Sequence, residues 1–301
     1  MFRSVLQRLL PPLLRRYPLY SGCSTIASTK PFVWLSGTGE ALATLRSGSR
    51  LFVRLDDYDG RSAFWFGDQD RKITWVAKRV LRPGDTVLDI GTNWGISALQ
   101  FATMVGPGGV VHAFEPQPAL ADAVGRSIAT NDMAQLHLHR VGLSNADADL
   151  TMRVPHDHTG AGTINALPPW FDSAVVDEVP VKFVAADPYV KALGLKSVRL
   201  VNLDVEGHEP DVLGGLTRMF ETTPPDVIVF EHAASGGEFW THPVVRFFTE
   251  RNYEICAIPL SSKQTPRLKR MVAPTVVPSH DYVAIANVAD RPQLEAALGV
   301  H

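Results

Sequence analysis

Hydrophobic residues recur along the chain in short apolar runs, separated by longer segments with helical spacing. The short runs predict strands over Thr86–Ile90, Val110–Phe114, Leu136–Val141, Val198–Asp204, Val227–Glu231, Tyr253–Ile258 and Tyr282–Ala286. Apolar residues three and four apart predict helices between most of them, over Ile96–Val105, Ala119–Asn131, Pro210–Phe220 and Pro243–Arg251. Strands that alternate with helices form a parallel sheet with crossover helices on both faces. We therefore expect an α/β fold with a doubly wound, Rossmann-like, seven-stranded sheet.

The pattern departs from this alternation at two places. No helical spacing separates Tyr253–Ile258 from Tyr282–Ala286, so these two strands are expected to pair antiparallel, which makes the last strand a reversed one. Between the third and fourth strands, Leu150–Val154 and Val179–Val184 predict an extra hairpin or an extended cover.

The segment upstream of the sheet has a different pattern. After a Gly/Ser-rich stretch, Leu51–Leu55 and Ala63–Phe66 are expected to be short strands around a turn, and Ile73–Leu81 is expected to be a helix. The sequence thus divides into a basic N-terminal helix and linker (1–50), short strands and a helix leading into the core (51–82), the sheet domain (83–290) and a tail (291–301).

The first residues are apolar and basic. Phe2–Leu10 has apolar residues at helical spacing, and Pro11-Pro12 is expected to end the helix, because proline lacks an amide proton and clashes with the preceding turn. No apolar run approaches the roughly 20 residues that span a bilayer. Three interpretations of residues 1–14 stay open: a helix packed on the domain or frayed, a peripheral membrane contact, and a mitochondrial targeting segment.

Charge and composition exclude several classes of protein. Residues 1–39 hold five basic residues and no acid, whereas the remainder holds 24 basic and 31 acidic residues. This acidic body is a poor match for a phosphate backbone, so no nucleic-acid partner is expected. A hydrophobic content of 45% excludes a largely disordered chain. Cys23 and Cys256 can build neither a disulfide framework nor a Cys-rich zinc site, so a reducing, cytoplasmic compartment is expected.

The first strand of the sheet ends in a glycine turn that runs directly into a helix. Gly91 and Gly95 let the backbone turn tightly and approach a ligand at the helix N-terminus. The dinucleotide fingerprint G-x-G-x-x-G has its second glycine where this chain has Asn93, which disfavours NAD(P). Asp89 repels phosphate and attracts an amine, and Glu115, at the next strand end, suits a ribose diol. These features favour S-adenosyl-L-methionine as the cofactor, because it has an amine and no phosphate.

Together with motifs further along, these residues carry a family resemblance. Over roughly Phe52 to Ala286 the chain resembles the FkbM-type S-adenosylmethionine-dependent methyltransferases. The matching pieces are Asp89-Ile90-Gly91-Thr92-Asn93-Trp94-Gly95, Phe114-Glu115-Pro116, Asn131, Gly142-Leu143-Ser144, Leu203-Asp204-Val205-Glu206-Gly207-His208-Glu209 and Val212-Leu213-Gly214-Gly215. Two positions depart from the family: Asn202, where Lys is usual, and Thr92, where Ala is usual.

The resemblance implies a role for each matching position. The cofactor-binding residues would be Asp89, Gly91, Asn93 and Gly95 around the methionine end, Glu115 at the ribose hydroxyls, and Gly142 and Leu143 near the adenine. The resemblance also implies O-methyltransferase activity on a hydroxyl of a glycan, a glycolipid or a secondary metabolite, since nothing in the residues themselves defines an acceptor.

Carboxylates and histidines gather after the fourth and fifth strands of the sheet. Methyl transfer needs alignment of the reactants and, for a hydroxyl, a group that accepts its proton. We expect Asp204 to lie near the charged sulfur or the amine of the cofactor. The candidate catalytic residues are Glu206, His208 and His232. Glu209 is explained equally well by its place in a first helical turn, where the helix dipole stabilises a negative charge.

The insertion after the third strand holds a second histidine pair, His156 and His158, followed by Gly160 and Gly162. Histidines two residues apart without a further fixed ligand are usually solvated, so no metal site is expected. The segment is expected to form a mobile cover over the substrate. Three aromatic residues could line a substrate cleft or anchor loops: Trp170, Phe239 and Trp240.

The leading hypothesis is therefore an S-adenosylmethionine-dependent O-methyltransferase that acts on a hydroxyl-bearing small molecule, glycan or lipid. Two alternatives stay open. One is N- or carboxyl-methylation with the same cofactor, and the other is a non-catalytic cofactor-fold protein that acts as a binding partner. Carboxylates at three strand ends, from Asp89, Glu115 and Asp204, argue against the second alternative. The oligomeric state is left open.

Overall fold

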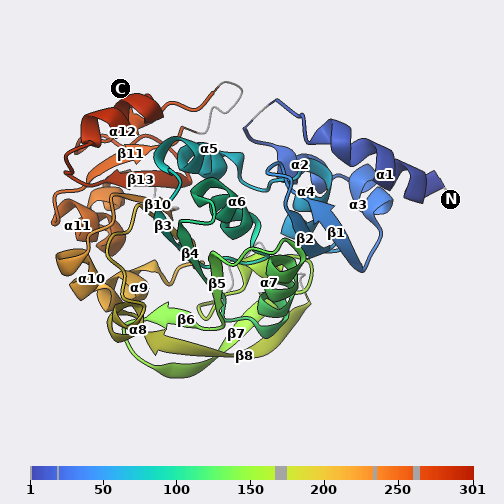
Figure 1. The fold of residues 1–301 in the computed structure, drawn as a ribbon, viewed down its shortest axis with the longest axis horizontal. Helices are drawn as coiled ribbons and strands as arrows, with labels where there is room; N and C mark the ends of the chain where they lie inside the picture. Colours follow the sequence, from blue (N-terminus) through green and yellow to red (C-terminus); the bar gives the residue numbers. More distant parts are fainter. Residues whose placement is uncertain (1, 19, 167–174, 233–235, 260–264) are drawn as a thin grey trace.

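A computed structural model describes residues 2–18, 20–166, 175–232, 236–259 and 265–301. Its centre is an eight-stranded sheet in the order β12-β11-β13-β10-β9-β3-β4-β5 (Figure 1). The strands are β3 (Thr86–Ile90), β4 (Val110–Phe114), β5 (Leu136–His139), β9 (Leu200–Leu203), β10 (Val227–Glu231), β11 (Glu254–Ala257), β12 (Lys269–Arg270) and β13 (Asp281–Ile285). Neighbours from β10 to β5 are parallel, whereas β13 is antiparallel to both β10 and β11. The predicted doubly wound sheet with a reversed last strand is confirmed, and the two-residue β12 extends its edge.

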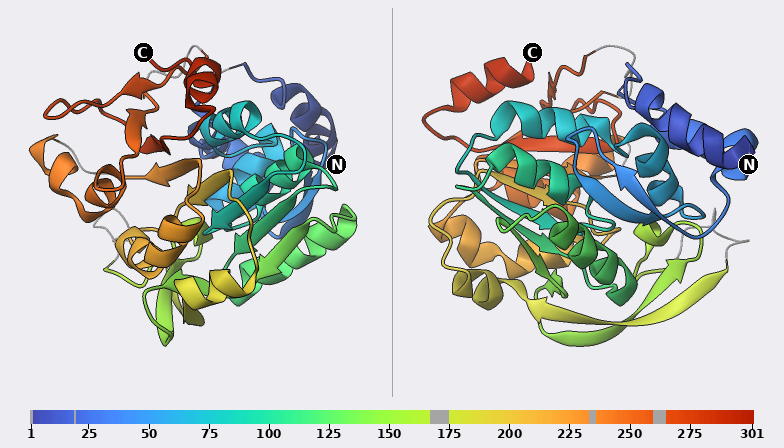
Figure 2. Two further views of the ribbon diagram at one scale, coloured as in Figure 1. Left: turned by 60° about the vertical axis from the view of Figure 1, so that its left-hand side comes forward. Right: turned by 45° about the vertical axis from the view of Figure 1, so that its right-hand side comes forward.

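Helices cover both faces of this sheet, as Figures 1 and 2 show. One layer holds α5 (Arg71–Val80), α6 (Ile96–Val105), α7 (Pro118–Thr130) and α12 (Arg291–Leu298). The other holds α8 (Ala186–Ala192), α9 (Glu209–Gly215), α10 (Thr217–Thr222) and α11 (Pro243–Thr249). Within β3, Val87 packs in the first layer and Leu88 in the second, because successive side chains of a strand point to opposite faces. The helix predicted over Pro210–Phe220 is divided into α9 and α10.

The insertion after β5 forms a second sheet of three strands in the order β6-β8-β7. These strands are β6 (Gly142–Ser144), β7 (Ala148–Pro155) and β8 (Val176–Ala185). Strands β7 and β8 pair antiparallel as a long ribbon along one side of the molecule, which confirms the predicted hairpin (Figure 2). Strand β6, which follows β5 in the chain, pairs parallel with β8.

Residues 2–66 pack beside the main sheet (Figure 1). Their elements are α1 (Phe2–Leu14), α2 (Cys23–Ala27), α3 (Lys30–Ser36), β1 (Glu40–Thr44), β2 (Arg50–Arg54) and α4 (Tyr58–Phe66). β1 and β2 pair antiparallel, and the amide of Phe52 donates to Ser127 Oγ of α7 at 3.0 Å. Among the described helices, none is both long enough and apolar enough to cross a bilayer.

Two predictions in this region are wrong. Pro11 and Pro12 lie inside α1 and do not end it, because Leu10 and Leu14 on either side of them pack into a cluster around Phe66. The segment predicted as a strand, Ala63–Phe66, is the end of helix α4. Long-range packing and helix capping override the local pattern in both cases.

Candidate functional site

Strands β3, β4, β9 and β10 end at one edge of the main sheet, where two cavities lie. The first cavity, of about 560 Å³, is bordered by the turn after β3, the end of β4, strand β6 and the short 3₁₀ turn Thr159–Ala161. Residues of the predicted cofactor set that line it are Gly91, Asn93, Glu115, Gly142, Leu143 and Asp204. We name it the cofactor cavity, since these predicted positions gather around it.

The turn after β3 needs glycine at its first position. Gly91 has a φ of 88°, and a Cβ atom there would overlap the carbonyl oxygen of Asp204 at the end of β9. The two strand ends therefore approach each other as closely as backbone allows. Gly95 also has a positive φ, 81°, but it starts α6 and faces Val124, outside the residues that line the cavity.

Glu115 is built into the wall of the cofactor cavity. Its side chain accepts hydrogen bonds from the amides of Asn93 at 2.9 Å and Gln117 at 2.8 Å. Burial raises the pKa of this carboxyl to about 8, against the effect of both hydrogen bonds. The carboxyl is therefore held in a fixed orientation, with each oxygen anchored to one amide.

Asp89 is satisfied inside the protein. It is fully buried, accepts from Thr92 Oγ1 at 2.6 Å and from Asn202 Nδ2 at 2.8 Å, and is not among the residues that line the cofactor cavity. Burial raises the pKa of its carboxyl. The two positions that depart from the family pattern, Thr92 and Asn202, are thus the two side-chain partners of one carboxyl.

A second cavity, of about 1040 Å³, adjoins the first and shares Asp204 and Glu206 with it. The other polar residues of its wall are Tyr58, Asp59, Gln69, Asp70, Lys72, Ser97, His158, Asn202, Glu231, His280 and Asp281. Lys72 Nζ is paired with Asp281 Oδ2 at 2.9 Å, so this wall has an excess of carboxylates. We name it the acceptor cavity.

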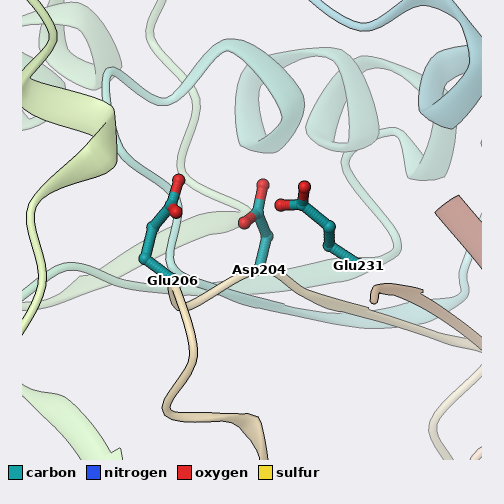
Figure 3. Close-up of side chains that lie close together, drawn as sticks. All are labelled: Asp204, Glu206 and Glu231. Atoms are coloured by element: carbon teal, nitrogen blue, oxygen red, sulfur yellow. The ribbon is translucent and has the colours of Figure 1, made fainter. Parts of the chain in front are cut away.

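Asp204, Glu206 and Glu231 form a carboxylate cluster where the two cavities meet (Figure 3). Each offers an oxygen within 4.8 Å of those of the other two. Burial and mutual repulsion raise the pKa of Glu206 to about 8 and that of Glu231 to about 7, and raise the pKa of Asp204 well above its usual value. Asp204 and Glu206 have exposed surface toward the cavities, yet protein surrounds the carboxyl groups on most sides. Oxygen ligands at this spacing could hold a divalent cation, a grouping that the sequence did not predict.

Of the three predicted catalytic residues, Glu206 and His208 line the same cavity, whereas His232 does not. Glu206 lies at the junction of the cavities with a left-handed φ of 50°, which is uncommon for a residue other than glycine. His208 lines the cofactor cavity, and its Nε2 lies 3.0 Å from Ser144 Oγ. His232 lines neither cavity, and its ring lies 4.0 Å from that of His242. Burial lowers the pKa of both predicted histidines, that of His232 to about 4.

Asp59 is a site residue that sequence reasoning missed, and His158 was expected only as part of a cover over the substrate. Both line the acceptor cavity, with His158 Nε2 3.6 Å from Asp59 Oδ2. Asp59 belongs to α4, in a segment read as a turn, so no local pattern placed it at the site. The other histidine of the predicted pair, His156, is exposed and lies 3.1 Å from Asp177.

The remaining residues singled out from the insertion and loops have mixed outcomes. Gly160 and Gly162 line the cofactor cavity, whereas the mobility of their segment stays a prediction. Phe239 is fully buried, 4.8 Å from the ring of Tyr282, and therefore anchors its loop. Trp240 Nε1 donates to a backbone carbonyl at 3.3 Å. Trp170 lies outside the described residues.

The sequence matches the family model described as "Methyltransferase FkbM domain" over residues 89–255. Curated relatives include Methyltransferase 1 of Beauveria bassiana, 29% identical over 53% of this chain and 69% of that protein. They also include the hexuronic acid methyltransferase AglP of Haloferax volcanii (28%, over 50% of this chain and 56% of that protein). A third is the 31-O-demethyl-FK506 methyltransferase FkbM of Streptomyces tacrolimicus (27%, over 45% and 61%). Among solved structures, an O-methyltransferase from Bacillus cereus in complex with SAH is 12% identical, with a TM-score of 0.41 over 72% of this chain and 79% of that one.

Proposed function

This chain belongs to the FkbM methyltransferase family, a family of S-adenosylmethionine-dependent enzymes, and from that premise we propose that it methylates a hydroxyl of a glycan, a glycolipid or a secondary metabolite. The observation that carries the proposal is the shared wall of the two cavities. Asp204 and Glu206 line both, so a methyl group presented from the cofactor cavity would meet an acceptor held in the second. Alignment of this kind is the main requirement of methyl transfer.

The cofactor cavity fits S-adenosylmethionine in its donor set. Glu115 offers two anchored carboxyl oxygens to the ribose hydroxyls, and the backbone of Gly91 and Gly142 borders the same cavity. Asp204 at the end of β9 lies where a sulfonium or an amine would be stabilised. When bound, the cofactor supplies a methyl group on a positively charged sulfur. The chain's own residues orient it and exclude water.

The acceptor cavity fits a molecule with several hydroxyl groups. Carboxylates, the amide of Gln69 and the imidazoles of its wall offer many hydrogen-bond partners, and Ile73 and Phe230 add apolar surface. One relative, named for a 31-O-demethyl compound, supports a hydroxyl acceptor, and another, named for a hexuronic acid, supports a sugar acceptor with both hydroxyl and carboxyl groups. Among the predicted catalytic residues, Glu206 is retained at this junction. We assign His208 to support of the cofactor cavity and His232 to packing.

Transfer of labelled methyl groups tests this proposal. The protein is incubated with methyl-labelled cofactor and with glycan, lipid and metabolite extracts, and products are identified by mass spectrometry. We expect a labelled methyl ether, and loss of label with Asp204→Asn. A methylated amine or carboxylate would instead support N- or carboxyl-methylation with the same cofactor. Calorimetric binding of S-adenosylhomocysteine without any transfer would point to a non-catalytic cofactor-binding protein.

We further propose a peripheral membrane contact through α1. One side of this helix packs on the protein through Leu10 and Leu14, while Val5, Leu9 and Leu13 are 46%, 60% and 61% exposed at helical spacing. Residues 1–39 carry five basic residues and no acid. An exposed apolar stripe beside positive charge suits the surface of an anionic bilayer.

Vesicle sedimentation tests the membrane contact. The full chain should sediment with vesicles of phosphatidylcholine and phosphatidylglycerol, and Leu9→Glu should abolish this. The matched control is Val272→Glu, an equally exposed apolar residue (64%) far from α1 in the sequence. Failure of the full chain to sediment would leave packing or targeting as the role of the segment.

A further inference from the structure

His158 is held in the wall of the acceptor cavity by residues that are far away in the sequence. Its ring lies against that of Tyr58, with 4.5 Å between the centroids, and its Nε2 lies 3.6 Å from Asp59 Oδ2. The side chain is 30% exposed, so one part of the ring meets protein while another meets the cavity. An imidazole oriented by a carboxylate next to a cavity is an arrangement suited to proton transfer.

Asp59 is itself fixed. Its side chain is 1% exposed and accepts hydrogen bonds from Gln69 Nε2 at 2.6 Å and from Asn93 Nδ2 at 3.0 Å. Asn93 belongs to the glycine turn of the cofactor cavity. The carboxylate that faces His158 is therefore tied directly to the backbone region that would hold the methyl donor.

The backbone on either side of His158 is hydrogen-bonded to the start of α4. The amide of Tyr58 donates to the carbonyl of Asp157 at 2.7 Å, and Asp57 accepts from both the amide and the hydroxyl of Thr159 at 2.8 Å. At Gly160 a Cβ atom would overlap side-chain atoms of Asp59 and Asn93. The segment thus approaches α4 more closely than any other residue type at this position would allow.

The charged groups around His158 favour its positive form. Burial lowers the pKa of the imidazole, but Asp59, Asp57 and Glu206 raise it, and the net effect is a raised pKa. His208 and His232 lie outside the acceptor cavity.

We propose that His158, oriented by Asp59, accepts the proton of the acceptor hydroxyl; this inference rests on the proposed O-methylation. As the hydroxyl oxygen forms its bond to the methyl carbon, the bond from carbon to sulfur breaks and its electron pair stays on sulfur. The hydroxyl proton moves to an imidazole nitrogen of His158 and is later released to water. His158 is the catalytic residue of this step, and Asp59 is a positioning residue that stabilises the imidazolium.

Substitution at two positions tests the catalytic part, with the extract fraction that becomes labelled in the preceding experiment as the acceptor. His158→Ala should slow single-turnover methyl transfer by about 10²- to 10⁴-fold, the usual contribution of a general base. S-adenosylhomocysteine should still bind with unchanged affinity. His156→Ala is the matched control, because His156 also faces a carboxylate but is not among the residues that line the acceptor cavity. Wild-type rates with His158→Ala, or a parallel loss of S-adenosylhomocysteine binding, would overturn the assignment.

The pH dependence tests the positioning part. A base must be neutral to act, so the rate should rise with pH through the pKa of His158. Asp59→Asn should move this midpoint to lower pH, since it removes a charge that raises the pKa. Histidine NMR on the S-adenosylhomocysteine complex, with the His158 signal assigned by its loss in His158→Ala, measures the same pKa without any acceptor. An unchanged His158 pKa in Asp59→Asn would overturn the positioning role of Asp59. Absence of methyl transfer by the wild-type protein would overturn the proposed O-methylation instead.

Discussion

At the scale of single residues, the site depends on backbone space and on partners for buried carboxyl groups. Gly91 allows β3 and β9 to end in contact. Thr92 and Asn202 supply the two side-chain donors of Asp89. A substitution at one of them would leave one oxygen of this buried carboxyl without its side-chain donor, which costs more than the hydrogen bond contributed.

Gly91→Ala should destabilise the protein by more than the strain of placing alanine at a positive φ. Gly84 is the matched control, because its φ is 95° and a Cβ atom there meets nothing within 4 Å. Gly84→Ala should cost about 1–2 kcal/mol, the strain of the left-handed region. Gly91→Ala should cost at least about 2 kcal/mol more, since Asp204 must move as well. Urea unfolding measures both, and equal costs would contradict the close approach of the two strand ends.

Glu115→Ala should weaken binding of S-adenosylhomocysteine by roughly 10- to 100-fold, because it removes two hydrogen bonds to the ribose that contribute about 0.5–1.5 kcal/mol each. The amides of Asn93 and Gln117 would also lose their acceptor. Isothermal calorimetry gives the affinity, and thermal unfolding checks that the variant stays folded. Unchanged affinity in a folded variant would remove Glu115 from the cofactor site.

At the scale of elements, the start of α4 joins three parts of the molecule. Asp57 is fully buried and caps α4 by accepting from the amide of Gly60 at 2.8 Å. The same carboxylate accepts from Trp94 Nε1, beside the glycine turn, and from Thr159 in the insertion. One side chain outside the matched family segment therefore couples α4 to both walls of the cofactor cavity.

Asp57→Ala should destabilise the protein by about 2–5 kcal/mol, since it removes a helix cap and leaves a buried indole N–H without its acceptor. Asp56→Ala is the control, because Asp56 is a partly exposed neighbour in an ion pair with Arg54 and should contribute at most about 1 kcal/mol. Denaturant unfolding measures both variants. Limited proteolysis should cut Asp57→Ala first near residues 156–162, and equal stability of the two variants would refute this coupling.

At the scale of the whole molecule, an acidic body concentrates carboxyl groups where two cavities meet. Burial raises the pKa values of Glu206 and Glu231 above those of an unfolded chain. The native state therefore binds more protons than the unfolded state in the range between the two sets of pKa values. The contribution of Glu206 and Glu231 to stability is fully present below their pKa in the unfolded chain, about 4.5. It is lost as the pH rises through their native pKa values of about 7 to 8.

Glu231→Gln should consequently stabilise the ligand-free protein at pH 8 by at least about 1 kcal/mol, the free energy of roughly one pKa unit. At pH 5 the variant and the wild type should unfold at similar temperatures, because Glu231 is already protonated in the native state. Calorimetry in the presence of EDTA measures this difference. Glu221→Gln, at an exposed position of α10, should have no effect at either pH, and a gain at pH 5 equal to that at pH 8 would contradict the raised pKa.

The sequence by itself determined the elements that follow from local alternation and the chemistry of contiguous motifs. The bounds of β3, β4, β10 and α6 coincide with their predicted ranges, because a strand buried on both faces is apolar along its whole length. The glycine turn and the stretch from Asp204 to Glu209 identified the family, since both occupy consecutive positions. The tertiary structure alone decided that Ala63–Phe66 is helical and that Pro11 and Pro12 stay within α1. It alone brought Asp59 to His158, because contacts between distant segments are set by packing and leave no periodic pattern in the sequence.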